Sequence, residues 1–162
     1  MGLVRTFQHD SLLSEMSVYD NILVATLQGL RGHKERDRRV RETAELTELS
    51  AFLDEAAGNL PHGRQRLLSI AIALATRPIL LCLDEPLTGL QGQEVARALD
   101  LFERLRTEHG ISILLVEHNM RAVMNVCDRV IVLNHGQLLA EGTPSEVSEN
   151  PTVIDAYLGK SK

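Results

Sequence analysis

Two acidic residues, Asp84 and Glu85, directly follow the apolar run 79–83 and directly precede Pro86. Carboxylates at the end of a buried strand are costly unless a positive charge offsets them. Mg²⁺ bound to a phosphate would do so, with one carboxylate on the metal side and the next orienting an attacking water. The two carboxylates are therefore a candidate metal and phosphate site. An ordinary turn or helix cap is the alternative.

A histidine, His118, stands after a second apolar run, 111–116, between Glu117 and Asn119. Ligands of open α/β sheets bind beyond the carboxyl ends of the strands. Polar residues that follow two such strands are thus candidates for one ligand site. A histidine at a strand end also serves purely structural roles, and this second interpretation stays open.

A loop at 58–63 leads directly into a helical pattern that begins near Arg64. The first turn of a helix presents free N–H groups and about half a positive charge, which attract phosphate. Gly63 permits close approach of the backbone, and Arg64 adds a full charge. These features predict a phosphate contact, although an ordinary loop before a helix has the same pattern. The candidate residues are Leu60, Pro61, His62, Gly63, Arg64 and Gln65.

The elements that must position these side chains alternate between strands and helices. The sequence predicts the end of a strand at 2–8 and further strands at 79–83, 111–116, 129–133 and 137–140. It predicts helices at 17–28, 34–57, 64–76, 92–108 and 119–127, and two short helices that start near 143 and 150. This alternation indicates an α/β fold with a mainly parallel sheet. The wholly apolar run 79–83 is typical of a strand buried on both faces, and 111–116 is predicted as a second buried strand.

Charge and composition narrow the function classes. The 162 residues carry a formal net charge of −5, which argues against a nucleic-acid partner. The segment 34–42 mixes both signs and indicates a solvated helix face, with a membrane-surface or nucleic-acid role as the alternative. Cys82 and Cys127 lack metal-ligand spacing, which favours reduced thiols and a cytoplasmic location. We expect no signal peptide and no membrane span, because no apolar run approaches the ~20 residues that a span needs.

The order of the motifs along the chain resembles the nucleotide-binding domain of ATP-binding-cassette (ABC) transporters. Gln8 matches the Q-loop of that family, and 60–65 match its signature loop. The strand 79–85 matches Walker B, 88–91 match the D-loop, and His118 matches the switch histidine. The set is more specific than any of its members.

Four further segments resemble one branch of that family, the ATP-binding subunits of branched-chain amino acid importers. These segments are 5–8, 16–21, 58–61 and 141–144. The resemblance implies an α/β fold of the P-loop NTPase type, present in part, with a mainly parallel sheet and a helical subdomain. It divides the chain into the Q-loop and helical subdomain at 1–58, the core at 59–142 and a helical tail at 143–162.

The resemblance also implies roles for particular residues. Asp84 would help to hold Mg²⁺, largely through water, and Glu85 would polarise the water that attacks ATP. His118 would contact the γ-phosphate, and Gln8 would sense the metal and the water. The signature loop, 60–65, would cover the ATP bound to a partner subunit. The D-loop residues would be Gly89, Leu90 and Gln91, with Gln91 in place of the usual Asp.

The implied partners are transmembrane permease subunits, a second ABC ATPase subunit in a head-to-tail dimer, and indirectly a periplasmic or extracellular binding protein. The implied place is the cytoplasmic face of the cell membrane. The 162 residues contain no Walker A pattern, Gly-x-x-x-x-Gly-Lys-Ser/Thr, so we expect no ATP turnover from this chain alone and exposed apolar sheet surface. The alternatives are a non-catalytic module that docks on a transporter or a partner ATPase, and a soluble ABC ATPase of DNA repair or translation.

Overall fold

The computed structural model describes residues 2–6, 12–27 and 29–158. The chain forms two compact units, residues 1–116 and 117–162, and each is described by itself. Among the described residues, none of the helices is both long and apolar enough to cross a membrane.

A three-stranded parallel sheet organises the first unit, in the order β1-β2-β3. The strands are β1 (Leu3–Arg5), β2 (Leu80–Asp84) and β3 (Ser112–Val116). All three predicted strands are therefore present, with β2 and β3 each starting one residue later than expected. The parallel direction brings the carboxyl ends of the three strands to the same edge of the sheet.

The two faces of this sheet differ in burial. Side chains alternate between the faces, so Leu81 and Leu83 of β2 share one face and are buried there. The helix α4 (Gln93–Thr107) packs against β3. On the other face Leu114 and Val116 of β3 are 53% and 54% exposed. The prediction of strands buried on both faces is thus wrong for β3, because no described element of the first unit covers that face.

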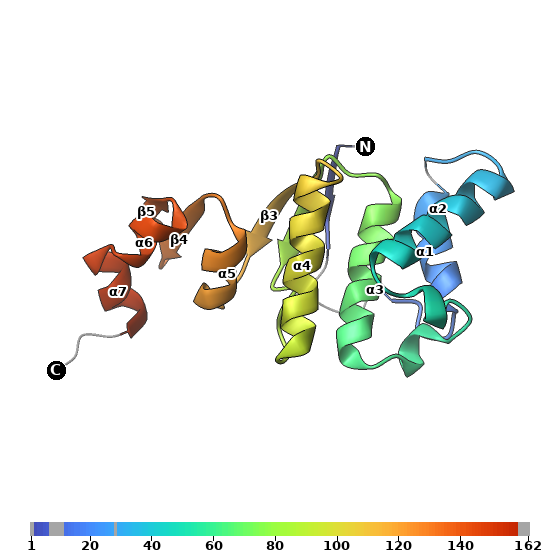
Figure 1. Ribbon diagram of the computed structural model, residues 1–162, viewed down its shortest axis with the longest axis horizontal. Helices are drawn as coiled ribbons and strands as arrows, with labels where there is room; N and C mark the ends of the chain where they lie inside the picture. The colour runs from blue at the N-terminus through green and yellow to red at the C-terminus, as the bar shows by residue number, and fades with distance from the viewer. Residues whose placement is uncertain (1, 7–11, 28, 159–162) are drawn as a thin grey trace. The chain divides into compact units, whose positions relative to one another are not determined.

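Three helices pack together to form the rest of the first unit. They are α1 (Val18–Thr26), α2 (His33–Leu46) and α3 (His62–Ala75), and each contacts the other two (Figure 1). Ser17 caps α1, because its side chain accepts the N–H of Asp20. The apolar core that they share includes Val18, Ile22, Val40, Ala44, Leu49, Leu68 and Ala71.

The predicted single helix 34–57 is wrong, because α2 ends at Leu46. Glu48 adopts a left-handed backbone with φ of 58°. The N–H of Leu49 then bonds the carbonyl of Ala44 at 2.7 Å, and the N–H of Glu48 bonds that of Glu45 at 3.2 Å. This pair of bonds is a Schellman C-cap, usually built on glycine. The segment beyond it contains only two 3₁₀ turns, Ser50–Phe52 and Ala57–Asn59.

The charged face of α2 carries several ion pairs, as the mixture of positive and negative side chains at 34–42 predicted. Asp37 pairs with Arg41 at 3.1 Å, and Glu42 lies 3.6 Å from Arg38. Arg39 instead turns inward and donates to the carbonyls of Leu74 and Ala75 at the end of α3. This long side chain therefore caps a neighbouring helix and does not face a ligand.

The second unit is a hairpin with three helices. They are α5 (Met120–Val126), α6 (Pro144–Ser148) and α7 (Pro151–Leu158). The antiparallel strands are β4 (Val130–Asn134) and β5 (Gln137–Gly142). His135 and Gly136 join them with positive φ angles of 47° and 77°, as a tight hairpin turn requires. Five valines form its core: Val123, Val130, Val132, Val147 and Val153.

Candidate functional site

Asp84, the last residue of β2, faces a cation from the neighbouring strand. The Nη2 of Arg5, the last residue of β1, lies 2.8 Å from the Oδ2 of Asp84. The register pairs Arg5 with Cys82, so Arg5 points to the same face as Asp84, which lies two residues beyond Cys82. The side chain of Asp84 is 19% exposed and that of Arg5 is 61% exposed. The sheet edge therefore carries a largely buried carboxylate that is paired with an exposed cation.

Glu85 sits where the chain turns out of β2. Its φ is 45°, a left-handed conformation that is rare and costly for a residue with a Cβ. Its N–H bonds the carbonyl of Val116 at 2.8 Å, which ties this turn to the end of β3. The hydroxyl of Thr88 donates to the Glu85 carboxylate at 3.3 Å. Such strain at a carboxylate fits a position selected for where it points its side chain and not for stability.

The predicted D-loop lies against the predicted signature loop within the first unit. Gly89 has a φ of 81°, and a Cβ added to it would lie 2.8 Å from the Cε1 of His62. The imidazole therefore occupies the space that a side chain at position 89 would take. A second contact lies beside it, because a Cβ at Gly63 would meet the carboxylate of Glu94. The N–H of Gln91 in turn donates to that carboxylate at 3.3 Å.

The signature-loop residues split between the core and the surface. Leu60 is 4% exposed and belongs to the core of α1, α2 and α3. Pro61 is the N-cap of α3 and has no side-chain cap bond, and the helix starts at His62, two residues before the predicted Arg64. The first-turn N–H groups of His62 and Gly63 have no intrahelical acceptor available to them. This helix start is the one that the sequence predicted as a phosphate contact.

Two polar side chains of the signature loop contact other residues of the first unit. The guanidinium of Arg64 stacks on the ring of Phe52 at 3.7 Å. The amide of Gln65 donates to the carbonyl of Leu60 at 3.0 Å and lies near that of Gly58 at 3.4 Å. Both side chains fix the loop on the helical part of the first unit. In this loop Pro61 and His62 are exposed, whereas Leu60 and Gly63 are buried.

His118 and Gln8 are predicted site residues that do not belong to the described part of the first unit. His118 belongs to the second unit, where its N–H donates to the Glu117 carboxylate at 3.2 Å. The side chain of Asn119 caps α5 by accepting the N–H of Ala122 at 3.2 Å. Gln8 lies outside the residues that the structure describes. Within the first unit the structure brings together Asp84, Glu85 and the D-loop.

The acidic pair suits a magnesium ion that arrives with a nucleotide. Within the described part of the chain, no three His, Cys, Asp or Glu side chains come together to hold a metal. Mg²⁺ usually keeps several waters and takes one or two carboxylates together with substrate phosphates. Asp84 and Glu85 provide that smaller donor set at the end of β2. The residues present therefore fit a metal whose other ligands come from water and phosphate.

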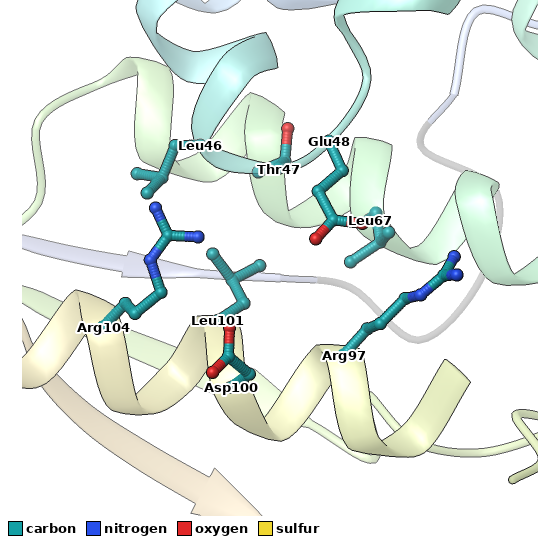
Figure 2. Close-up of a pocket in the computed structure, with 8 residues that line it drawn as sticks. All are labelled: Leu46, Thr47, Glu48, Leu67, Arg97, Asp100, Leu101 and Arg104. Atoms are coloured by element: carbon teal, nitrogen blue, oxygen red, sulfur yellow. The ribbon is translucent and has the colours of Figure 1, made fainter. Parts of the chain in front are cut away.

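One small cavity lies apart from these residues, where α4 faces α3 and the end of α2 (Figure 2). Its volume is about 10 Å³, room for about one water molecule. Nucleotide-sized ligands need pockets of roughly 300 Å³ or more. Figure 2 shows that its polar rim comes mainly from α4, through Arg97, Asp100 and Arg104. This cavity is therefore a packing defect between helices and not a ligand site.

Sequence reasoning missed three contributors to the site. These are Arg5, Phe52 and Glu94. The alternation of side chains along β1 and β2 could have placed Arg5 on the face of Asp84. Nothing in the sequence pairs Phe52 with Arg64 or Glu94 with Gly63, because these contacts join segments brought together only by the packing of helices.

Comparison with known proteins agrees with the motif order. The family described as "ABC transporter" matches residues 2–88, and the family described as "Branched-chain amino acid ATP-binding cassette transporter" matches residues 137–162. The chain is 40% identical to BraF of Pseudomonas aeruginosa, a high-affinity branched-chain amino acid transport ATP-binding protein. That match covers 99% of this chain and 69% of BraF. LivG of Escherichia coli, which bears the same description, is 41% identical with the same coverage.

A solved structure shares the fold. MJ1267, an ATP-binding cassette of an ABC transporter, superposes in its ADP conformation with a TM-score of 0.85 at 28% identity. This match covers 98% of the chain and 69% of MJ1267, which confirms the expected α/β fold of the P-loop NTPase type. The chain belongs to the ABC transporter family of ATP-binding proteins, in the branch of the branched-chain amino acid transport ATP-binding proteins.

Proposed function

We propose that this chain works in the ATP-binding and ATP-hydrolysing subunit of an ABC importer that takes up branched-chain amino acids. The observation that carries the proposal is the placement of Asp84 and Glu85 at the carboxyl end of β2, with the D-loop folded back on the signature loop. The similarity to BraF and LivG over 99% of the chain supports the substrate class.

In this proposal the two carboxylates divide the work. Asp84 lies on the metal side and acts mainly through water, and Mg²⁺, when bound, neutralises phosphate charge. Glu85 polarises the attacking water. Its strained turn, tied to β3 through the carbonyl of Val116, holds its Cα in place and so limits where the carboxylate can point. His118 would contact the γ-phosphate, and Gln8 would sense the metal.

The signature loop and D-loop act toward a second subunit in this proposal. The free first-turn N–H groups of α3 would face the γ-phosphate of a partner's ATP in a head-to-tail dimer. Gly89, Leu90 and Gln91 would signal between the subunits, and the contact of Gly89 with His62 would link the two loops. The helical part of residues 1–58 would dock on transmembrane permease subunits at the cytoplasmic membrane face, with a binding protein acting indirectly. Residues 59–142 would form the core and 143–162 a tail.

The test follows uptake and ATP turnover together. Cells that carry Glu85→Gln in place of the native residue should lose ATP-driven leucine uptake. ATP hydrolysis by the purified transporter should fall by on the order of 10²–10⁴. Glu103→Gln, on the exposed face of α4, is the matched control and should leave both unchanged. Unchanged turnover in Glu85→Gln would remove this residue from the role.

A non-catalytic module that docks on a transporter or a partner ATPase is the second candidate. It predicts a different result in the same experiment. Deletion of the chain would then abolish uptake, while Glu85→Gln would leave uptake intact.

A further inference from the structure

The ion pair between Arg5 and Asp84 joins two residues whose roles differ in the proposed function. Asp84 is the metal-side carboxylate, whereas no role in the reaction has been given to Arg5. The two side chains share the uncovered face of the sheet, at the ends of adjacent parallel strands. Their separation of 2.8 Å is that of a charge-assisted hydrogen bond.

The two side chains of this pair differ in exposure, and the difference favours replacement of Arg5 by another cation. Asp84 is 19% exposed and is held at the end of the central strand, so its carboxylate stays in place. Arg5 is 61% exposed, and its long side chain can swing into solvent at small cost. A carboxylate that loses its cation in a partly buried site regains a desolvation penalty, so it needs a replacement charge.

We propose that Arg5 is a resident counter-ion that orients and neutralises Asp84 until Mg²⁺ arrives, and that it leaves when the metal binds. Arg5 is thus a positioning residue that competes with the cation and touches neither metal nor nucleotide. The inference rests on the proposed metal role of Asp84. Two physical facts support competition: the guanidinium occupies one of the lone-pair sites of Oδ2, and its positive charge repels a divalent ion nearby.

The competition predicts that removing the guanidinium tightens metal binding. The probe is Mn²⁺ alone, which takes the same oxygen ligands as Mg²⁺ and whose free form is counted by electron paramagnetic resonance. Exposed ion pairs are weak, so we expect Arg5→Gln to lower the apparent Kd for Mn²⁺ by about two- to fivefold. Arg5→Lys keeps a competing charge and should stay near the wild-type value. Arg97→Gln removes an exposed arginine from α4 and should change nothing.

The Asp84→Asn variant distinguishes failure of the counter-ion inference from failure of the proposed metal role. If Asp84→Asn abolishes Mn²⁺ binding and Arg5→Gln tightens it, the counter-ion role is supported. If Asp84→Asn abolishes binding but Arg5→Gln binds equally or more weakly, the inference is overturned and the metal role stands. If Asp84→Asn has no effect, the proposed metal role fails and the inference falls with it. Should Arg5→Gln lose its circular-dichroism signature of folding, Arg5→Met keeps the apolar stem and replaces it.

Discussion

The left-handed backbone of Glu85 predicts a reversal of the usual effect of glycine on stability. At ordinary positions glycine is less stabilising than alanine, because it loses more chain entropy on folding. At Glu85 the φ of 45° brings any Cβ too close to the backbone. Glu85→Gly should therefore be more stable than Glu85→Ala. Both substitutions remove the same side-chain contacts, so the comparison isolates the backbone.

The magnitude follows from two opposing terms. A Cβ in the left-handed region costs about 1–2 kcal/mol, and the extra entropy lost by glycine is about 0.5–1 kcal/mol. The difference favours glycine by roughly 0.5–1 kcal/mol, which shifts the melting temperature of a chain of this size by about 1–4 °C. Glu103, exposed in the middle of α4, is the matched control, and there glycine should be worse than alanine by about 1 kcal/mol.

Thermal and urea unfolding of the four variants, followed by circular dichroism, measure these differences. The difference in stability between the glycine and alanine variants should have opposite signs at the two positions. The glycine variant should be the more stable one at position 85 and the less stable one at position 103. If Glu85→Ala equals or exceeds Glu85→Gly, the left-handed strain at this turn is absent and the reasoning fails. A confirmed reversal would identify a carboxylate whose placement costs stability, as expected where function fixes a side chain.

Three further predictions address the core, the uncovered sheet face and the tail. Ile22→Ala, at a site that is 0% exposed, should destabilise the first unit by about 2–5 kcal/mol in urea unfolding, whereas Val24→Ala, at a 44% exposed site of the same helix, should cost under about 0.5 kcal/mol. Leu114→Thr should reduce self-association in light scattering without loss of stability, because Leu114 is 53% exposed on the sheet; unchanged scattering would contradict this. The backbone N–H of Thr143, and then its hydroxyl, hold the pKa of Glu146 below its ordinary 4.5. The stability from this capping box should be present above pH 4.5 and lost as pH falls through the folded pKa, so the melting-temperature advantage of wild type over Glu146→Gln should vanish in acid.

The sequence predicted the local elements well where one physical signal dominated. Apolar runs ended by charged or polar residues predicted β2 and β3 to within one residue. The predicted helix starts at 17 and near 143 coincide with the N-caps of α1 and α6, Ser17 and Thr143, because a side-chain oxygen there meets a free N–H only three residues away. The motif order gave the family, since each motif is short and local.

Tertiary structure alone decided the rest. The sequence predicted a helix that continues past Leu46 to residue 57, because a glutamate at 48 gives no sign of a left-handed cap. The cap forms because Leu49 is buried in the core that α1, α2 and α3 share. The strands β2 and β3 have similar apolar sequences, yet only β3 leaves alternate residues exposed, because burial depends on which neighbours cover a face. The pairing of Arg5 with Asp84 likewise depends on strand order and register, which local sequence does not specify.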